Sequence, residues 1–129
     1  MNDNKSGLRK RILSFRFAFK GILKLIKSEP NAMIHLIATI IAIACGFIFM
    51  ISGSEWCAIF IVIGLVWAAE SFNTVIEKLV DHLFPEFHET ARVTKDIAAG
   101  AVLICAIISV IVGLIVFLPR VIEAFYKWH

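Results

Sequence analysis

The sequence predicts an all-α membrane protein, in which an N-terminal amphipathic helix lies at the membrane interface and three further helices cross the bilayer. Of its 129 residues, 60% are apolar, whereas ordinary globular chains are about 45–50% apolar. Two long segments carry no formal charge, and a shorter apolar segment lies between them. A chain of this length and composition is expected to form one membrane-embedded domain, residues 1–129.

The first predicted element, residues 6–28, is the interfacial helix. Its apolar residues recur at helical spacing and its basic residues cluster on another face, a pattern typical of helices that lie in the membrane plane. Residues 1–28 hold eight of the thirteen Lys and Arg residues, which favours a cytoplasmic N-terminus. Such residues also attract anionic lipid without further function. Because this basic surface belongs to a membrane protein, no nucleic-acid partner is expected.

Two of the predicted spans, residues 31–51 and 96–118, come from long uncharged segments. No charged residue occurs between Pro30 and Ser54 or between Ile97 and Pro119. A transmembrane helix needs roughly 20 mostly apolar residues to cross about 30 Å of hydrocarbon. Each segment is therefore long enough to span the bilayer.

The remaining predicted span, residues 56–80, contains polar residues. Its uncharged part, Trp56 to Ala69, has fourteen residues, or about 21 Å of helix, which is shorter than the hydrocarbon layer. If this segment spans the membrane, Glu70 and Asn73 enter with it. A single carboxylate could equally mark the water interface.

Four polar residues of this segment share one helical face. At 100° per residue, Glu70, Asn73, Glu77 and Asp81 fall within an arc of about 80°. Ionisable residues at membrane depth face a bundle interior or an aqueous cavity and are functional-site candidates. Basic residues in the connection that follows place this polar stripe at the cytoplasmic side. Three helices are not expected to enclose a stripe about 16 Å long, so a symmetric oligomer is expected to shield it.

The chemistry that suits such a stripe is phosphoryl transfer. Carboxylates near a membrane surface can bind a divalent cation together with substrate phosphates, and a carboxylate free of metal can act as a general base on a hydroxyl. Lys95 supplies a point charge suited to phosphate. A non-enzymatic oligomer whose polar stripe lines an ion or proton path is the alternative.

Two motifs carry a family resemblance. ESFNTVIEKLVD at Glu70 and TKDIAAGAV at Thr94 combine the patterns E-x-x-N-T-x-I-E-x-x-x-D and K-D-x-A-A-G-A-V. Together with SFRFAFKGI at Ser14, EPNAMIHL at Glu29 and GLIVFLP at Gly113, they make the chain resemble the prokaryotic diacylglycerol kinase and undecaprenol kinase family. These are small integral-membrane lipid kinases, and the resemblance covers most of the chain.

The resemblance implies an ATP-dependent enzyme that phosphorylates the hydroxyl of a membrane lipid alcohol. It also implies a homotrimeric helical bundle whose active sites are shared between neighbouring subunits, in the bacterial inner (cytoplasmic) membrane. Glu70 matches the candidate general base, while Glu77 and Glu29 match the residues that hold the Mg²⁺ bound to ATP. The residues expected on the nucleotide side are Asn73, Asp81, Lys95, Asp96, Lys10 and Phe17.

Some of these residues also have plain structural interpretations. Lys95 and Asp96 could simply start a helix, where the dipole favours an acid. Asp81 could be a solvated interface residue, and Glu29 could be an interfacial carboxylate that starts a helix before Pro30.

The substrate is indicated by smaller features. The E-x-N-x-x-I-H pattern that ends at His35 and the terminal F-L-P resemble the undecaprenol kinase branch, which favours undecaprenol over diacylglycerol. Met33 and Val75 depart from residues common in the family, and neither belongs to the proposed chemistry.

Overall fold

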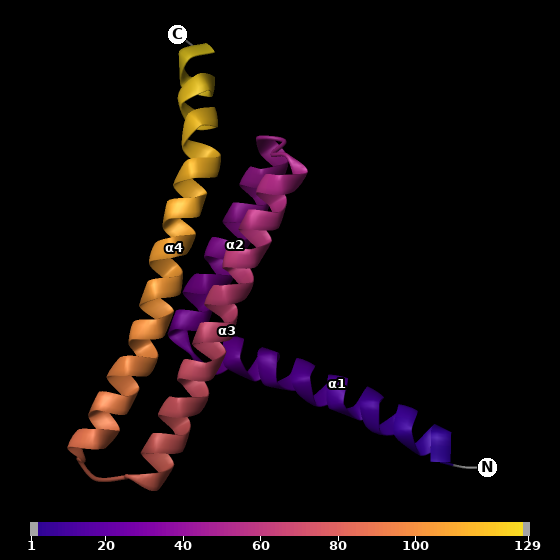
Figure 1. The fold of residues 1–129 in the computed structure, drawn as a ribbon, viewed down its shortest axis with the longest axis vertical. Coiled ribbons are helices and arrows are strands. Elements are labelled where there is room, and N and C mark those ends of the chain that lie inside the picture. Colours follow the sequence, from indigo (N-terminus) through magenta and orange to yellow (C-terminus); the bar gives the residue numbers. More distant parts are fainter. Residues whose placement is uncertain (1–2, 128–129) are drawn as a thin grey trace.

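The computed structural model describes residues 3–127, and the side chains of residues 7–127. It contains four helices, and the described residues include no strand. Three helices are long and apolar enough to cross a membrane, which confirms the all-helical prediction with three candidate spans. The first helix projects away from the bundle that the other three form (Figure 1). The helices are α1 (Asp3–Ser28), α2 (Pro30–Ile48), α3 (Gly53–Leu83) and α4 (Glu89–Lys127).

α1 exposes its described apolar and basic side chains alike along most of its length, and Leu25, near its end, is buried. Its location in the membrane interface stays a prediction. The break between α1 and α2 falls at Glu29, whose backbone is extended, with Pro30 in the first turn of α2. This arrangement follows from proline chemistry, because the residue before a proline avoids the helical region and proline itself fits a helix start.

α2 ends at Ile48, three residues before the predicted end of that span. Met50 adopts a positive φ of 46°, and the Ile51 N–H donates to the Gly46 carbonyl at 3.2 Å, so the chain turns sharply. Gly46 is needed for close packing, since a Cβ there would lie 2.5 Å from Cη2 of Trp56.

α3 is continuous from Gly53 to Leu83, so the uncharged segment and the polar stripe belong to one helix. Ser52 caps its N-terminus: the Ser52 hydroxyl accepts from the Glu55 N–H, and the Glu55 carboxylate accepts from the Ser52 N–H at 2.7 Å. Such a capping box satisfies two backbone donors that the helix would otherwise leave unpaired.

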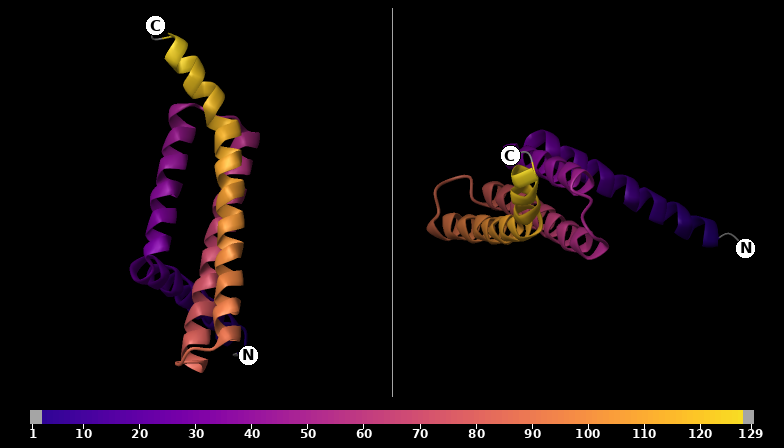
Figure 2. Two further views of the ribbon diagram at one scale, coloured as in Figure 1. Left: turned by 90° about the vertical axis from the view of Figure 1, so that its left-hand side faces the viewer. Right: turned by 90° about the horizontal axis from the view of Figure 1, so that it is seen from above.

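α4 extends beyond the predicted span at both ends, because helical turns with charged residues continue past the apolar segment. It lies side by side with α3, and its last turns bend away from the rest of the helix (Figure 2). Pro119 lies inside this helix. Ile51, Ile59 and Val116 form the buried apolar core between the two. α3 and α4 thus form an antiparallel hairpin.

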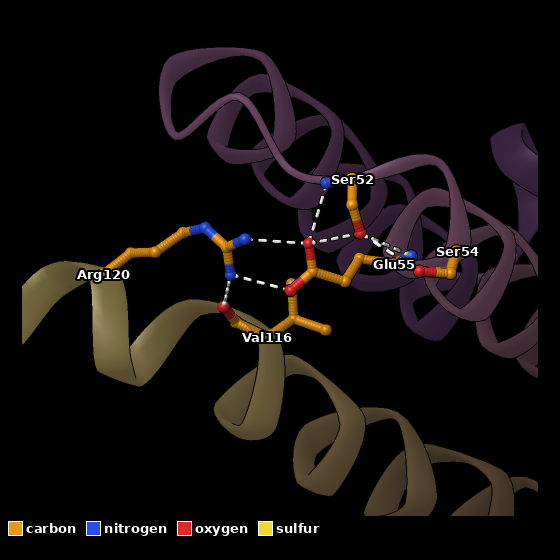
Figure 3. A network of polar contacts seen from close by, with 5 residues as sticks. All are labelled: Ser52, Ser54, Glu55, Val116 and Arg120. Atoms are coloured by element: carbon orange, nitrogen blue, oxygen red, sulfur yellow. Dashed lines mark hydrogen bonds and ion pairs between the residues drawn. The ribbon is translucent and has the colours of Figure 1, made fainter.

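The two ends of the bundle are distinct. The N-terminus and the α3–α4 loop lie toward one end, and the α2–α3 loop and the C-terminus lie toward the other (Figure 1). At the second end, Arg120 donates to both oxygens of Glu55 at 2.8 Å and also to the Val116 carbonyl at 2.7 Å (Figure 3). This bidentate pair ties α4 to the start of α3.

Candidate active site

Glu70 is the most deeply buried ionisable residue of the described chain, with 2% of its surface exposed. Its Oε2 atom lies 3.7 Å from Nε2 of His35 on α2, and within the described residues this oxygen has no hydrogen-bond partner. An unsatisfied buried polar atom is costly and calls for an explanation. A reacting group brought by a substrate would supply the missing partner.

Asn73 lies one turn further along α3 and is 5% exposed. Its amide Nδ2 donates to Glu77 Oε1 at 3.1 Å, while its Oδ1 is buried and has no partner among the described residues. Glu77 is half-buried and Asp81 is exposed. The exposure of the side chains thus rises along the stripe toward the α3–α4 loop.

This gradient corrects one expectation from the sequence. The chain by itself encloses Glu70 and Asn73, so their burial needs no second subunit. The expectation that a single chain leaves the stripe open holds only for its outer part, at Glu77 and Asp81. The reason is that α2 lies beside the inner part of the stripe, where His35 faces Glu70.

Glu29 lies between α1 and α2 and pairs with α3. The Lys78 ammonium donates to its Oε1 at 2.6 Å, and the Ser28 hydroxyl donates to the same oxygen at 3.1 Å. The hydrogen bond from Lys78, and to a smaller extent that from Ser28, holds the pKa of Glu29 below its usual value. Glu29 is therefore a carboxylate at neutral pH, as a metal ligand must be.

Lys95 on α4 forms an ion pair of 2.8 Å with Asp81 on α3. Asp96, its neighbour, pairs with Arg92 at 3.2 Å within α4. These four residues line a cavity of about 400 Å³ beside the α3–α4 loop, together with Phe84, Pro85, Glu86, Phe87, His88 and other residues. The cavity brings cationic side chains to the same end of the bundle as the outer part of the stripe.

Lys10 and Phe17 are exposed on α1. Within the described part of the chain, neither forms a hydrogen bond or ion pair with another predicted site residue. The structure therefore brings together Glu70, Asn73 and Glu77 on one side and Lys95, Asp81 and Asp96 on the other, and leaves these two residues apart.

The carboxylates of the site could take part in holding a divalent cation together with other ligands. No group of three or more His, Cys, Asp or Glu residues among those described is arranged to hold a metal by itself. Mg²⁺ usually takes one or two carboxylates and completes its shell with water and substrate phosphates. Glu29 and Glu77 supply that number of carboxylates, and Oδ1 of Asn73, which has no partner among the described residues, adds an oxygen beside Glu77.

Two contacts of the site were not predicted from the sequence. His35 faces Glu70, and Lys78 pairs with Glu29. Each joins two elements that are distant in sequence, so helical periodicity within one segment gives no signal for it. The only sequence signal was the E-x-N-x-x-I-H pattern, which contains Glu29 and His35 but indicated substrate, not contact.

A bundle of candidate membrane-spanning helices, with a buried carboxylate and a set of charged pairs toward one end, defines a small integral-membrane protein with a polar site. Its class becomes specific on comparison with known proteins. The family model described as "Prokaryotic diacylglycerol kinase" matches residues 16–117. The chain belongs to the prokaryotic diacylglycerol kinase family, and it is accordingly a lipid kinase.

Individual relatives agree with the family. The chain is 39% identical to an undecaprenol kinase from Bacillus subtilis (strain 168) over 118 residues, which cover 92% of this chain and 96% of the relative. It is 32% identical to a diacylglycerol kinase from Synechocystis sp., over 87% of this chain and 65% of that protein. Identity to the diacylglycerol kinase of Escherichia coli (strain K12) is 26%, over 86% of this chain and 91% of the relative.

Proposed function

We propose that this enzyme transfers the γ-phosphoryl group of Mg-ATP to the hydroxyl of a membrane lipid alcohol at the cytoplasmic membrane surface. Undecaprenol is the favoured substrate and diacylglycerol the second. The observation that carries the proposal is the buried Glu70 carboxylate, placed one turn from the Asn73–Glu77 pair on a helix of a lipid kinase. The undecaprenol preference is supported by the relative with 39% identity over nearly its full length.

Glu70 acts as the general base in this proposal. Its carboxylate takes the proton of the lipid hydroxyl while the hydroxyl oxygen attacks the γ-phosphorus, and the bond from that phosphorus to the bridging oxygen breaks to release ADP. Burial supports the role, because a base shielded from water meets only a hydroxyl that the site admits. The products are the lipid phosphate and ADP.

The remaining residues bind and neutralise the nucleotide. Lys95 and Asn73 contact the phosphates, with Asp96 and Asp81 on the nucleotide side. Glu29 and Glu77 would hold the Mg²⁺ of Mg-ATP, which spreads and neutralises charge on the phosphates. Phosphoryl transfer needs mainly positioning and electrostatic stabilisation, and this donor set can supply both.

The working assembly in this proposal is a homotrimer in the bacterial inner membrane, with a cytoplasmic N-terminus. The outer stripe, at Glu77 and Asp81, is the part that a neighbouring subunit would cover. Lys10 and Phe17 would then reach the nucleotide on the membrane surface, where α1 provides a basic face. α1 projects from the bundle (Figure 1), and this leaves it free to contact another subunit.

The test of substrate is a direct assay in lipid. Purified protein in phospholipid vesicles is given Mg-ATP labelled in the γ-phosphate, with either undecaprenol or diacylglycerol at matched mole fractions. We expect label in both lipids, with a higher kcat/KM for undecaprenol. Transfer to diacylglycerol alone would overturn the preference, and transfer to neither lipid, with ATP binding retained, would overturn the proposed reaction.

A further inference from the structure

We propose that His35 is a positioning residue for the phosphoryl-transfer reaction, acting by holding the carboxylate of Glu70. This inference rests on the proposed role of Glu70 as general base. His35 Nε2 lies 3.7 Å from Glu70 Oε2, and this oxygen has no hydrogen-bond partner among the described residues. The His35 side chain is 16% exposed, so water has little access to the contact.

The register that brings His35 to Glu70 is fixed by a second interhelical contact one turn away. The Trp67 indole on α3 donates to the Thr39 hydroxyl on α2 at 3.1 Å, and that hydroxyl donates to the His35 carbonyl at 2.7 Å. On the other side of His35, the Lys78 ammonium on α3 donates to Glu29 Oε1, directly before α2, at 2.6 Å. α2 is thus tied to α3 on both sides of His35, and these contacts set the register in which the histidine faces Glu70.

The distance between His35 Nε2 and Glu70 Oε2 is one that a small movement would shorten to a hydrogen bond. At 3.7 Å the two atoms are attracted but are too far apart for a hydrogen bond, which needs about 3.2 Å or less between N and O. Catalytic hydrogen bonds are often long before substrate binds and shorten in the reactive complex. An imidazole N–H that closes on Oε2 would restrict rotation of the carboxylate and leave its other oxygen to receive the proton of the hydroxyl.

His35 also borders an apolar groove of about 350 Å³ between α2, α3 and α4, lined by Ile34, Ala38, Ala42, Val66 and other residues. A role in holding the lipid chain is therefore the competing interpretation of this residue. The two roles differ in kinetics. Loss of positioning lowers kcat, whereas loss of a groove contact raises the KM for lipid while kcat is kept.

The experiment compares His35→Leu with His35→Gln in vesicles under Mg-ATP, with His82→Leu as the matched control. Leucine fills the space without a donor, whereas the glutamine amide offers a donor near the position of Nε2. His82 is exposed in the last turn of α3 and belongs to no proposed site. We expect His35→Leu to lower kcat by about tenfold to a hundredfold, the scale of a misplaced reacting group. His35→Gln should keep most of kcat, and His82→Leu all of it.

A double variant tests whether the effect passes through Glu70. In the Glu70→Gln background, His35→Leu should cause no further loss, since the base it holds is gone. Trp67→Phe, which removes the donor to Thr39, should lower kcat less than His35→Leu and leave the lipid KM unchanged. Helix content and elution volume in detergent establish that each variant is folded.

The outcomes separate this inference from the proposed function. Full kcat in His35→Leu, a rise in lipid KM alone, or an equal loss in the leucine and glutamine variants would each overturn the positioning role. If Glu70→Gln abolishes turnover while His35→Leu does not affect it, only the inference about His35 fails. If Glu70→Gln itself keeps normal turnover, the proposed role of Glu70 fails first.

Discussion

The two ends of the bundle use the same residue type, glutamate, in opposite ways. Glu55, near the α2–α3 loop, accepts hydrogen bonds from Arg120 at both oxygens and from the Ser52 backbone and hydroxyl (Figure 3). Glu70 is more deeply buried, yet its Oε2 has no hydrogen-bond partner within the described residues. Both oxygens of the Glu55 carboxylate thus accept hydrogen bonds within the fold, whereas Oε2 of Glu70 remains available to a substrate.

The difference indicates that the fold is less stable at Glu70 than it could be, and that a function of this residue explains the cost. A paired and capped carboxylate contributes to holding helices in place, whereas an unsatisfied buried carboxylate lowers stability unless a ligand satisfies it. Charged residues retained at membrane depth are functional candidates for this reason. The comparison predicts that substitutions at Glu70 change activity more than stability, and that substitutions at Glu55 do the reverse.

The largest effect is expected from Glu70→Gln. Glutamine keeps the size and the hydrogen bonding of the side chain but is not basic, so turnover should fall by about 10² or more, the usual contribution of general base catalysis. Mg-ATP binding should be kept, because the substituted group is not a proposed metal ligand. The measurement is kcat in vesicles, with nucleotide affinity determined separately.

Thermal unfolding in detergent measures the effect of Glu70→Gln on stability. Glu70→Gln removes a buried carboxylate whose Oε2 has no hydrogen-bond partner among the described residues, so its Tm should equal or exceed that of the parent. A fall in Tm together with normal turnover would reverse the assignment and make Glu70 a structural residue.

The stripe that contains Glu70 could be predicted from the sequence because it depends on the period of one helix. Glu70, Asn73 and Glu77 share a face of α3, and the structure brings Asn73 and Glu77 into contact. Periodicity does not show which neighbouring helix covers that face. For this reason the position of α2 beside Glu70, with His35 facing the carboxylate, could not be predicted from periodicity.

The ends of the helices show the same difference between what a local pattern predicts and what it does not. Uncharged segments located α2 and the central part of α4, but α4 continues through charged turns to Lys127, and helix formation does not require an apolar sequence. The Glu55–Arg120 pair could not be predicted from the sequence either, because its two residues lie 65 positions apart in the chain. Contacts between distant positions need the packed structure.

The next effect in size concerns the metal. Glu29→Gln and Glu77→Gln each remove a proposed oxygen ligand of the Mg²⁺ that accompanies ATP. Loss of an outer-shell partner already lowers metal affinity by about tenfold or more, so each variant should raise the magnesium concentration for half-maximal rate by at least about tenfold. The measurement is rate against free magnesium at saturating lipid and a fixed total concentration of ATP.

Glu89→Gln is the matched control for the metal variants. Glu89 is exposed in the first turn of α4, at the same end of the bundle, and it pairs with Arg92 at 3.2 Å. Its substitution removes a carboxylate without touching the proposed ligands. An unchanged magnesium dependence in both ligand variants, or an equal change in the control, would show that these carboxylates do not bind the metal.

The smallest effect on turnover is expected at the opposite end of the bundle, from Glu55→Gln and Arg120→Gln. Either substitution removes the charge-assisted pair that joins α4 to the start of α3. Glutamine at position 55 can still accept from the Ser52 N–H, and this should preserve part of the cap. Each variant should lower the Tm by a few degrees and leave kcat and the magnesium dependence unchanged, because the pair lies far along α3 from Glu70.

The double variant should unfold at a higher temperature than the sum of the single effects predicts, since it leaves no unpaired charge. Thermal unfolding in detergent measures the change in Tm, and activity in vesicles at 25 °C measures kcat. If Glu55→Gln stays folded but loses turnover, the paired end is coupled to the site, and the division of the molecule into a structural and a reactive end is wrong.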